Sequence, residues 1–154
     1  YVVATALGTG LRKSELKNLR VEDMDLKKRE IKAVNRGAEA RTKTGKNRIV
    51  DLSVNLVEIL SKYTPKSEYV FDFTNFRRNW EKTKKLSGVA CRFHDLRHTF
   101  ITICLQNGIQ PTSVADWVGH ADLRMIMKIY KHLQRDHLKE EINKLNGLYG
   151  GNAP

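Results

Sequence analysis

The sequence contains few cysteines, few prolines and no long apolar run. Its 154 residues include three prolines and two cysteines, Cys91 and Cys104. The two cysteines are thirteen residues apart and indicate neither a disulfide framework nor a Cys-x-x-Cys metal site, so we expect two reduced thiols. No run approaches the roughly 18 apolar residues that cross a membrane, and no charged-then-apolar stretch resembles a secretory leader. We therefore expect a cytoplasmic protein that does not associate with membranes.

Acidic residues are also in short supply. The chain has 17 Asp and Glu residues against 28 Lys and Arg residues, which gives a formal net charge of +11 at pH 7. Such a positive field attracts polyanions such as DNA, RNA or an acidic membrane. The hydrophobic fraction of 40% and the charged fraction of 29% are those of an ordinary globular domain with a sizeable core.

The apolar spacing predicts a mainly α-helical domain with one small antiparallel β-hairpin, an α+β fold. Strands are expected over residues 30–35 and 48–52. Helices are expected over residues 1–7, 12–19, 53–63, 75–86, 94–107, 111–119, 122–133 and 136–146. We interpret residues 1–154 as a single domain with a flexible tail over 147–154. Because the first expected helix starts without a cap at Tyr1, we expect the chain to be a fragment of a longer protein.

Groups suited to phosphate chemistry gather in the second half of the chain. His94 and Arg97 lie three residues apart, so they share one helical face at the expected start of a buried helix. Free N–H groups and the helix dipole favour an anion there. His120 and Tyr130 follow, and they add a group that exchanges protons near neutral pH and a possible nucleophile. The alternative is structural: His94 caps the helix, Arg97 is a surface charge, and Tyr130 packs in the core.

Zinc binding is a second alternative for this segment. His94 and His98 have the His-x-x-x-His spacing of a helical zinc site. The metalloprotease motif requires Glu after the first histidine, where this chain has Asp95, and no third ligand is in register. We therefore expect no metal and no other cofactor.

A basic loop joins the two expected strands. Arg41, Lys43 and Lys46 lie on it, and Arg48 follows at the start of the second strand. A basic hairpin of this kind can enter a DNA groove or deliver a proton. We therefore predict DNA contacts for Arg41, Lys46 and Arg48, and Lys43 or Lys46 is the candidate proton donor.

Five short motifs in order make the chain resemble the tyrosine recombinase (phage integrase) family. Listed along the sequence, they are Thr9-Gly-Leu-Arg-Lys-Ser-Glu-Leu16, Thr42-Lys-Thr-Gly45, His94-Asp-Leu-Arg-His-Thr-Phe100, Val118-Gly-His120 and Tyr130-Lys-His132. In that family, these motifs carry an arginine, a lysine, a His-x-x-Arg pair, a histidine and a nucleophilic tyrosine. The sequence departs at Asp51, where family members often have Pro, and the stretch between Lys43 and His94 is short.

The resemblance implies the following roles around a DNA phosphate. Arg12 and Arg97 would hold its non-bridging oxygens, and His120 would donate a third hydrogen bond. These donors would stabilise the charge that develops in the transition state.

The resemblance also assigns the steps that move protons. Tyr130 would attack and form a 3′-phosphotyrosine, His94 would help to accept its proton, and Lys43 would protonate the departing 5′ oxygen as a general acid. The implied partner is double-stranded DNA, bound by a homotetramer on paired sites that is monomeric in free solution. The alternatives are a type IB topoisomerase that relaxes DNA and a non-catalytic DNA-binding module of the same fold.

Overall fold

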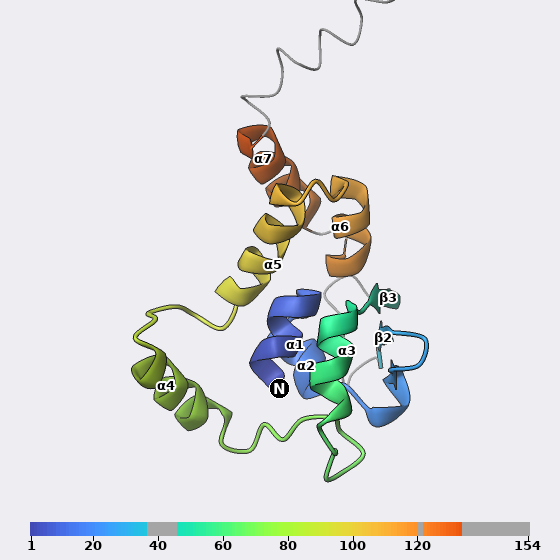
Figure 1. The fold of residues 1–154 in the computed structure, drawn as a ribbon, viewed down its shortest axis with the longest axis vertical. Helices are drawn as coiled ribbons and strands as arrows, with labels where there is room; N and C mark the ends of the chain where they lie inside the picture. The colour runs from blue at the N-terminus through green and yellow to red at the C-terminus, as the bar shows by residue number, and fades with distance from the viewer. Residues whose placement is uncertain (37–45, 120–121, 134–154) are drawn as a thin grey trace, which may run out of the picture.

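The fold is mainly helical with one small antiparallel sheet, as the sequence predicts (Figure 1). The computed structural model describes residues 1–36, 46–119 and 122–133; the expected helix over 136–146 and tail over 147–154 lie outside these ranges. The elements are α1 (Val2–Thr9), α2 (Lys13–Lys17), η1 (Val21–Asp23), β1 (Met24–Asp25), β2 (Glu30–Ala33), β3 (Arg48–Asp51), α3 (Val54–Ser61), α4 (Phe76–Ser87), α5 (Asp95–Gln106), α6 (Pro111–Val118) and α7 (Leu123–Leu133). None of the helices in these ranges has the length and apolarity to span a membrane.

The sheet has the strand order β1-β2-β3, and both pairs are antiparallel. The predicted hairpin is confirmed as β2 and β3, in a register that pairs Ile31 with Val50. These two side chains are fully buried, whereas Lys32 and Ile49 on the opposite face are exposed. The alternation of period two therefore sets which face of the hairpin packs on the helices. The short strand β1 was not predicted.

The first helix ends where a tight turn brings three helices together. Gly10 follows α1 with a φ of 64°, a left-handed conformation that glycine adopts without strain. A Cβ atom at Gly10 would lie 2.5 Å from Phe100 of α5 and 2.9 Å from Val118 of α6. The missing side chain therefore allows the turn before Arg12 to approach the middle of α5 and the end of α6.

Two hydrophobic clusters form the core. The first lies among α1, α2, the sheet and α3, and the second lies among α5, α6 and α7. Trp117 packs against both clusters, and its indole Nε1–H donates to Asp51 of β3 at 2.7 Å. This side chain therefore joins the end of α6 to the sheet.

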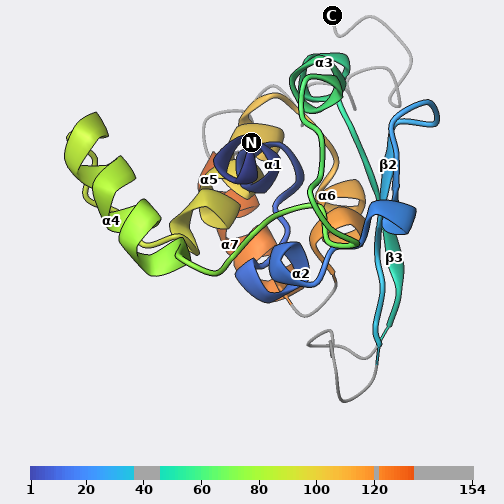
Figure 2. The same cartoon turned by 90° about the horizontal axis from the view of Figure 1, so that it is seen from below.

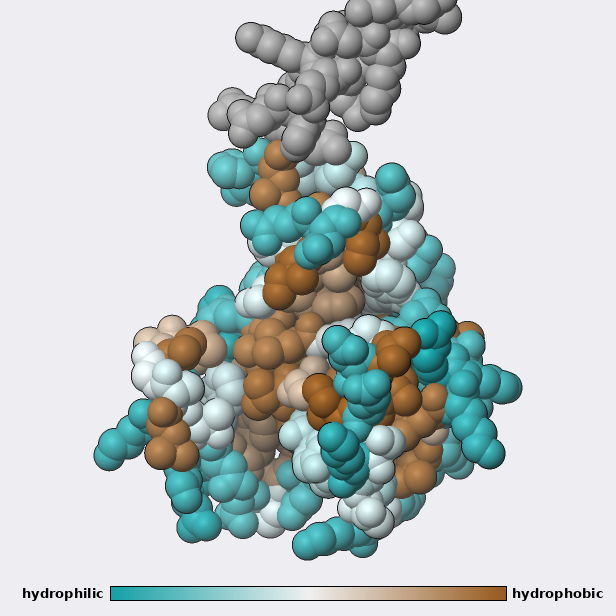
Figure 3. All heavy atoms as spheres, in the orientation of Figure 1, coloured by the Kyte–Doolittle hydropathy of each residue, from teal (hydrophilic) through white to brown (hydrophobic). Residues whose placement is uncertain are grey.

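The helix α4 stands apart from the rest of the fold, as two perpendicular views show (Figures 1 and 2). None of its residues is buried. Phe76 and Trp80 contact Phe93 edge-on, with ring centroids 5.0 and 5.2 Å apart. Figure 3 shows apolar side chains in the hollow between α4 and the main body. The helix is thus attached mainly through aromatic contacts near its first turns.

Candidate active site

Arg97 lies at the centre of the candidate site. It is on the first turn of α5, and its side chain is only 2% exposed. Its guanidinium donates to the carbonyl oxygens of Gly10 and Val118 and to the Oδ2 atom of Asp122. The chain therefore buries a guanidinium among acceptors from three separate segments, as a buried charge requires.

Arg12 approaches the same carboxylate from another direction. Its Nη2 atom lies 2.6 Å from Oδ2 of Asp122, the oxygen that also receives a hydrogen bond from Arg97. One anionic oxygen is thus shared by two guanidiniums whose motifs lie far apart in the sequence. The structure brings together Arg12 and Arg97, as the sequence predicts for a common anion.

Glu15 holds Arg12 from the other side. Its carboxylate accepts from the backbone N–H of Arg12 at 2.8 Å and from Nη1 of Arg12 at 3.2 Å. The same carboxylate makes a bidentate pair with Arg48, with both distances 2.8 Å. Nε of Arg48 donates to the carbonyl oxygen of Trp117 at 2.6 Å. Arg48, a predicted DNA contact, therefore directs its guanidinium into the protein, where it links β3 to α2 and α6.

Charges inside this network alter the pKa values of two members. Burial by itself would raise the pKa of Glu15, but hydrogen bonds and charge from Arg48 and Arg12 outweigh it and hold the pKa below its ordinary value. Burial and then the nearby charge of Arg12 lower the pKa of Arg97. Glu15 is therefore an anion at neutral pH, and a guanidinium stays charged despite such a shift.

His94 lies next to the arginines, at the N-terminal cap of α5. Partial burial is the first cause that lowers its pKa below the ordinary histidine value, and electrostatic repulsion from His98, Arg97 and Arg12 lowers it further. Asp122 acts in the opposite direction. The imidazole is therefore neutral at pH 7 and able to accept a proton.

The zinc alternative gains no support from this geometry. The rings of His94 and His98 are perpendicular, with centroids 4.9 Å apart. Across residues 1–36, 46–119 and 122–133, no three His, Cys, Asp or Glu side chains gather as a metal site would need.

Tyr130 does not lie beside the arginines. It is on α7 and packs against the second hydrophobic cluster, where it lines a hollow of about 320 Å³ with Gln106, Gly108 and Gln110. These neighbours lie at or just after the C-terminal end of α5, whereas Arg97 is on its first turn. Along α5, nine residues separate Arg97 from Gln106, a rise of about 13 Å. The phenol and the arginine pair thus occupy opposite ends of α5.

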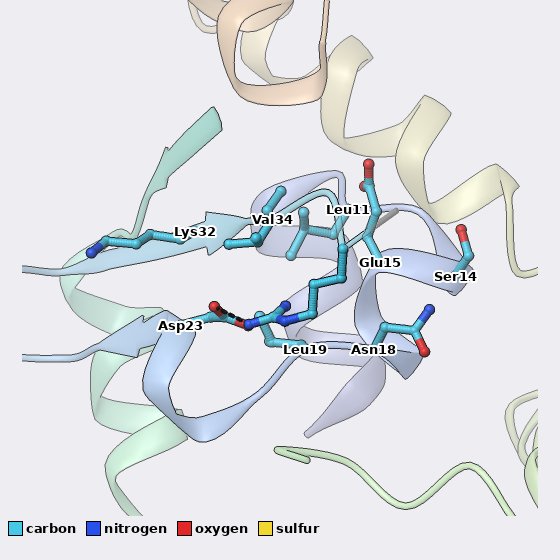
Figure 4. Close-up of a pocket in the computed structure, with 10 residues that line it drawn as sticks. Leu11, Ser14, Glu15, Asn18, Leu19, Asp23, Lys32 and Val34 are labelled. Carbon is cyan, nitrogen blue, oxygen red and sulfur yellow. Dashed lines mark hydrogen bonds and ion pairs between the residues drawn. The ribbon is translucent and has the colours of Figure 1, made fainter. Parts of the chain in front are cut away.

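The base of the basic hairpin is anchored, although its tip lies outside the described residues. Arg36 pairs with Asp23 at 2.8 Å and with Glu22 at 3.1 Å. Asp23 and Glu15 line a neighbouring cavity of about 10 Å³, and Figure 4 shows that the two side chains lie apart. Lys46 is exposed at the other side of the base. The predicted residues Arg41, Lys43 and His120 also lie outside the described ranges.

Sequence reasoning missed Glu15 and placed Asp122 only at the start of the helix expected over residues 122–133. The signal for Glu15 was present, because it lies three residues after Arg12 and therefore on the same face of α2. Asp122 contacts an arginine that is 110 residues away in sequence. No local spacing could reveal that contact.

Comparisons with known proteins point to the family that the five sequence motifs resemble. A sequence model described as the phage integrase family matches residues 1–137. The chain is 33% identical to tyrosine recombinase XerA of Saccharolobus solfataricus, over 99% of this chain and 52% of that protein. The chain spans about half the length of the curated relatives that it matches.

Solved structures show the same fold. The crystal structure of XerA recombinase is 29% identical with a TM-score of 0.66, over 94% of this chain and 57% of that chain. The catalytic domain of bacteriophage HP1 integrase is 24% identical with a TM-score of 0.70, over 99% of this chain and 84% of that chain.

Proposed function

This chain belongs to the phage integrase family, and we propose that it is the catalytic part of a site-specific DNA recombinase. It would cut and rejoin DNA strands through a 3′-phosphotyrosine intermediate. The observation that carries this proposal is the convergence of Arg12 and Arg97 on one anionic oxygen. Two guanidiniums placed in this way suit the non-bridging oxygens of a phosphodiester.

The arginine pair supplies electrostatic stabilisation in this proposal. Attack by a phenol concentrates negative charge on the phosphoryl oxygens, so fixed cations there stabilise the transition state more than the ground state. The contacts of Arg97 with Gly10 and Val118, and of Arg12 with Glu15, fix both guanidiniums before substrate arrives. Removal of one such donor typically costs about 3 kcal/mol of transition-state stabilisation.

Proton transfers are assigned to the remaining groups. His94 has a lowered pKa and is neutral at pH 7, so it can assist removal of the Tyr130 proton. Lys43, or alternatively Lys46, would protonate the leaving 5′ oxygen. His120 would donate a further hydrogen bond to the phosphate. The phosphotyrosine bond preserves the energy of the broken phosphodiester, so a second DNA hydroxyl can reverse the step without a cofactor.

Double-stranded DNA is the proposed partner, within the cytoplasm or nucleoid. The net charge of +11 favours it, and α4 adds an outlying surface with five cations that are not buried. These are Arg77, Arg78, Lys82, Lys84 and Lys85. We propose a monomer in solution and a tetramer on paired sites. The relatives' recombinase names favour strand exchange over topoisomerase activity or simple DNA binding.

A covalent-adduct assay tests the proposal. The chain is incubated with a pool of nicked duplexes of randomised sequence, denatured, and resolved by electrophoresis. We expect a protein–DNA adduct that maps to Tyr130 and joins the 3′ phosphate. Tyr130→Phe should abolish the adduct and retain DNA binding, whereas the matched variant Tyr69→Phe should preserve both. An adduct that persists in Tyr130→Phe would show that the nucleophile is wrongly assigned.

A further inference from the structure

We call the position between the guanidiniums of Arg12 and Arg97 the anion seat, and a carboxylate of the protein itself occupies it. Oδ2 of Asp122 receives hydrogen bonds from both guanidiniums, and its side chain is only 17% exposed. A phosphate oxygen bound by the same two Nη2 atoms would need this position. A second anion beside the carboxylate would also be repelled by it. Phosphate and the Asp122 carboxylate therefore compete for one place.

The seat also contains an unused donor. Within the described part of the chain, the buried Nε atom of Arg97 has no hydrogen-bond partner. A carboxylate that contacts Arg97 through one oxygen leaves this N–H unsatisfied, which is unfavourable for a buried donor. A phosphate has more acceptor oxygens and can engage a guanidinium through two parallel bonds. The arginine pair is therefore better matched to phosphate than to Asp122.

Asp122 connects the seat to the helix that carries the nucleophile. It directly precedes α7 (Leu123–Leu133), on which Tyr130 lies eight residues later. The ion pairs of Asp122 thus fix one end of α7 at the arginines, while Tyr130 lies against the far end of α5. Eight helical residues span about 12 Å, and reacting atoms must approach to about 3–3.5 Å. With Asp122 seated in this way, the phenol is held away from the phosphate position.

We propose that Asp122 is a positioning residue that takes the place of the scissile phosphate in the DNA-free protein. Phosphate binding displaces its carboxylate, releases the start of α7 and so allows Tyr130 to approach. No covalent bond changes in this step; one anion replaces another on the two guanidiniums. This inference rests on the proposed function, because it takes the arginine pair as the phosphate site.

Inorganic phosphate provides a test that needs no target sequence. Its apparent Kd is measured from the shift in melting temperature, and hydrogen exchange is followed in the peptide that covers residues 123–133. In the wild-type chain, we expect phosphate to accelerate exchange in α7. Asp122→Asn keeps the shape and removes the charge, so we expect faster exchange without phosphate and no further response. If the Asp122 carboxylate occupies the anion seat in about nine of ten wild-type molecules, Asp122→Asn should bind phosphate about tenfold more tightly than the wild-type chain.

Two further variants distinguish the replacement of the Asp122 carboxylate by phosphate from general effects of charge. Glu58→Gln removes one negative charge from an exposed position on α3 and should change the phosphate Kd little. Asp122→Glu restores the carboxylate and should recover weak phosphate binding. The inference is overturned if Asp122→Asn binds phosphate no more tightly than Glu58→Gln, or if phosphate slows exchange in wild-type α7. The wild-type measurement decides the matter even if a variant does not fold.

The two proposals can fail separately. Failure of the wild-type chain to form an adduct at Tyr130 would remove the recombinase assignment. An adduct that forms normally, together with an unchanged phosphate Kd in Asp122→Asn, would remove only the role of Asp122.

Discussion

Substitution of Glu15 by glutamine would weaken the support of Arg12 without changing the nucleophile or either arginine of the anion seat. The carboxylate is 6% exposed and accepts hydrogen bonds from both Arg12 and Arg48. Glutamine has nearly the same volume, but it is neutral and has one acceptor oxygen in place of two. In the variant, Arg48 therefore loses one of its two hydrogen bonds to the side chain at position 15, and the positive charge of Arg48 is no longer compensated there.

The size of the effect follows from the burial of the pair. Removal of one partner from a buried ion pair typically costs about 3–5 kcal/mol. Because the glutamine oxygen still accepts one hydrogen bond, we expect a loss near the lower end, about 3 kcal/mol of unfolding free energy. For a chain of this size, that corresponds to a fall in melting temperature of roughly 6–12 °C.

Chemical denaturation at pH 7 measures the loss, and Glu22→Gln provides the control. Glu22 also pairs with an arginine, at 3.1 Å, but its side chain is 68% exposed, so its loss should cost less than about 1 kcal/mol. A Glu15→Gln variant as stable as Glu22→Gln would refute the reasoning.

The pH dependence gives a second check on Glu15. Its pKa is lower in the folded chain than in the unfolded chain. Its stabilising effect is therefore complete above the ordinary carboxyl pKa, near 4.3, and is lost as the pH falls through the lowered value. The stability gap between wild type and Glu15→Gln should stay constant from pH 7 to about 5 and narrow in more acidic solution.

Two other predictions concern the turn and the proton acceptor. Gly10→Ala places a methyl group 2.5 Å from Phe100 at a φ of 64°, so thermal unfolding should show a loss of about 3 kcal/mol from strain and overpacking; an unchanged melting temperature would contradict the packing of this turn. The lowered pKa of His94 keeps the imidazole neutral into mildly acidic solution, so an NMR titration of the DNA-free chain should place its midpoint below pH 6.5. Asp122→Asn removes the charge that raises this pKa and should move the midpoint to still lower pH, whereas a wild-type midpoint above 6.5 would contradict the environment of His94 in the structure.

The elements of the fold could be predicted because their signals are local. Ser53 caps α3 through a 3.3 Å hydrogen bond from the N–H of Leu56, and Pro111 begins α6. The alternation around Ile31 and Val50 identified both hairpin strands. The strand β1 has only two residues, too few to show an alternating pattern.

Only part of the geometry around the candidate site could be predicted from the sequence. The family resemblance implied that Arg12 and Arg97 face one anion, and both guanidiniums contact Asp122. The resemblance could not indicate that Arg48 would turn inward to Glu15, because a basic residue beside a basic loop has the same sequence signature whether it is paired or exposed. The position of Tyr130 depends on the direction in which α7 leaves the arginines, and contacts between distant segments determine that direction.

The outlying position of α4 has a consequence for how this helix keeps its shape. Its aromatic contacts are near the first turns, whereas Lys82, Lys85 and Leu86 near its end are exposed. A short helical end without tertiary contacts is only marginally stable in water. Its lysines therefore lie on the portion most prone to fraying. A polyanion that binds them must also order this last stretch, so its measured affinity reports helix formation together with charge attraction.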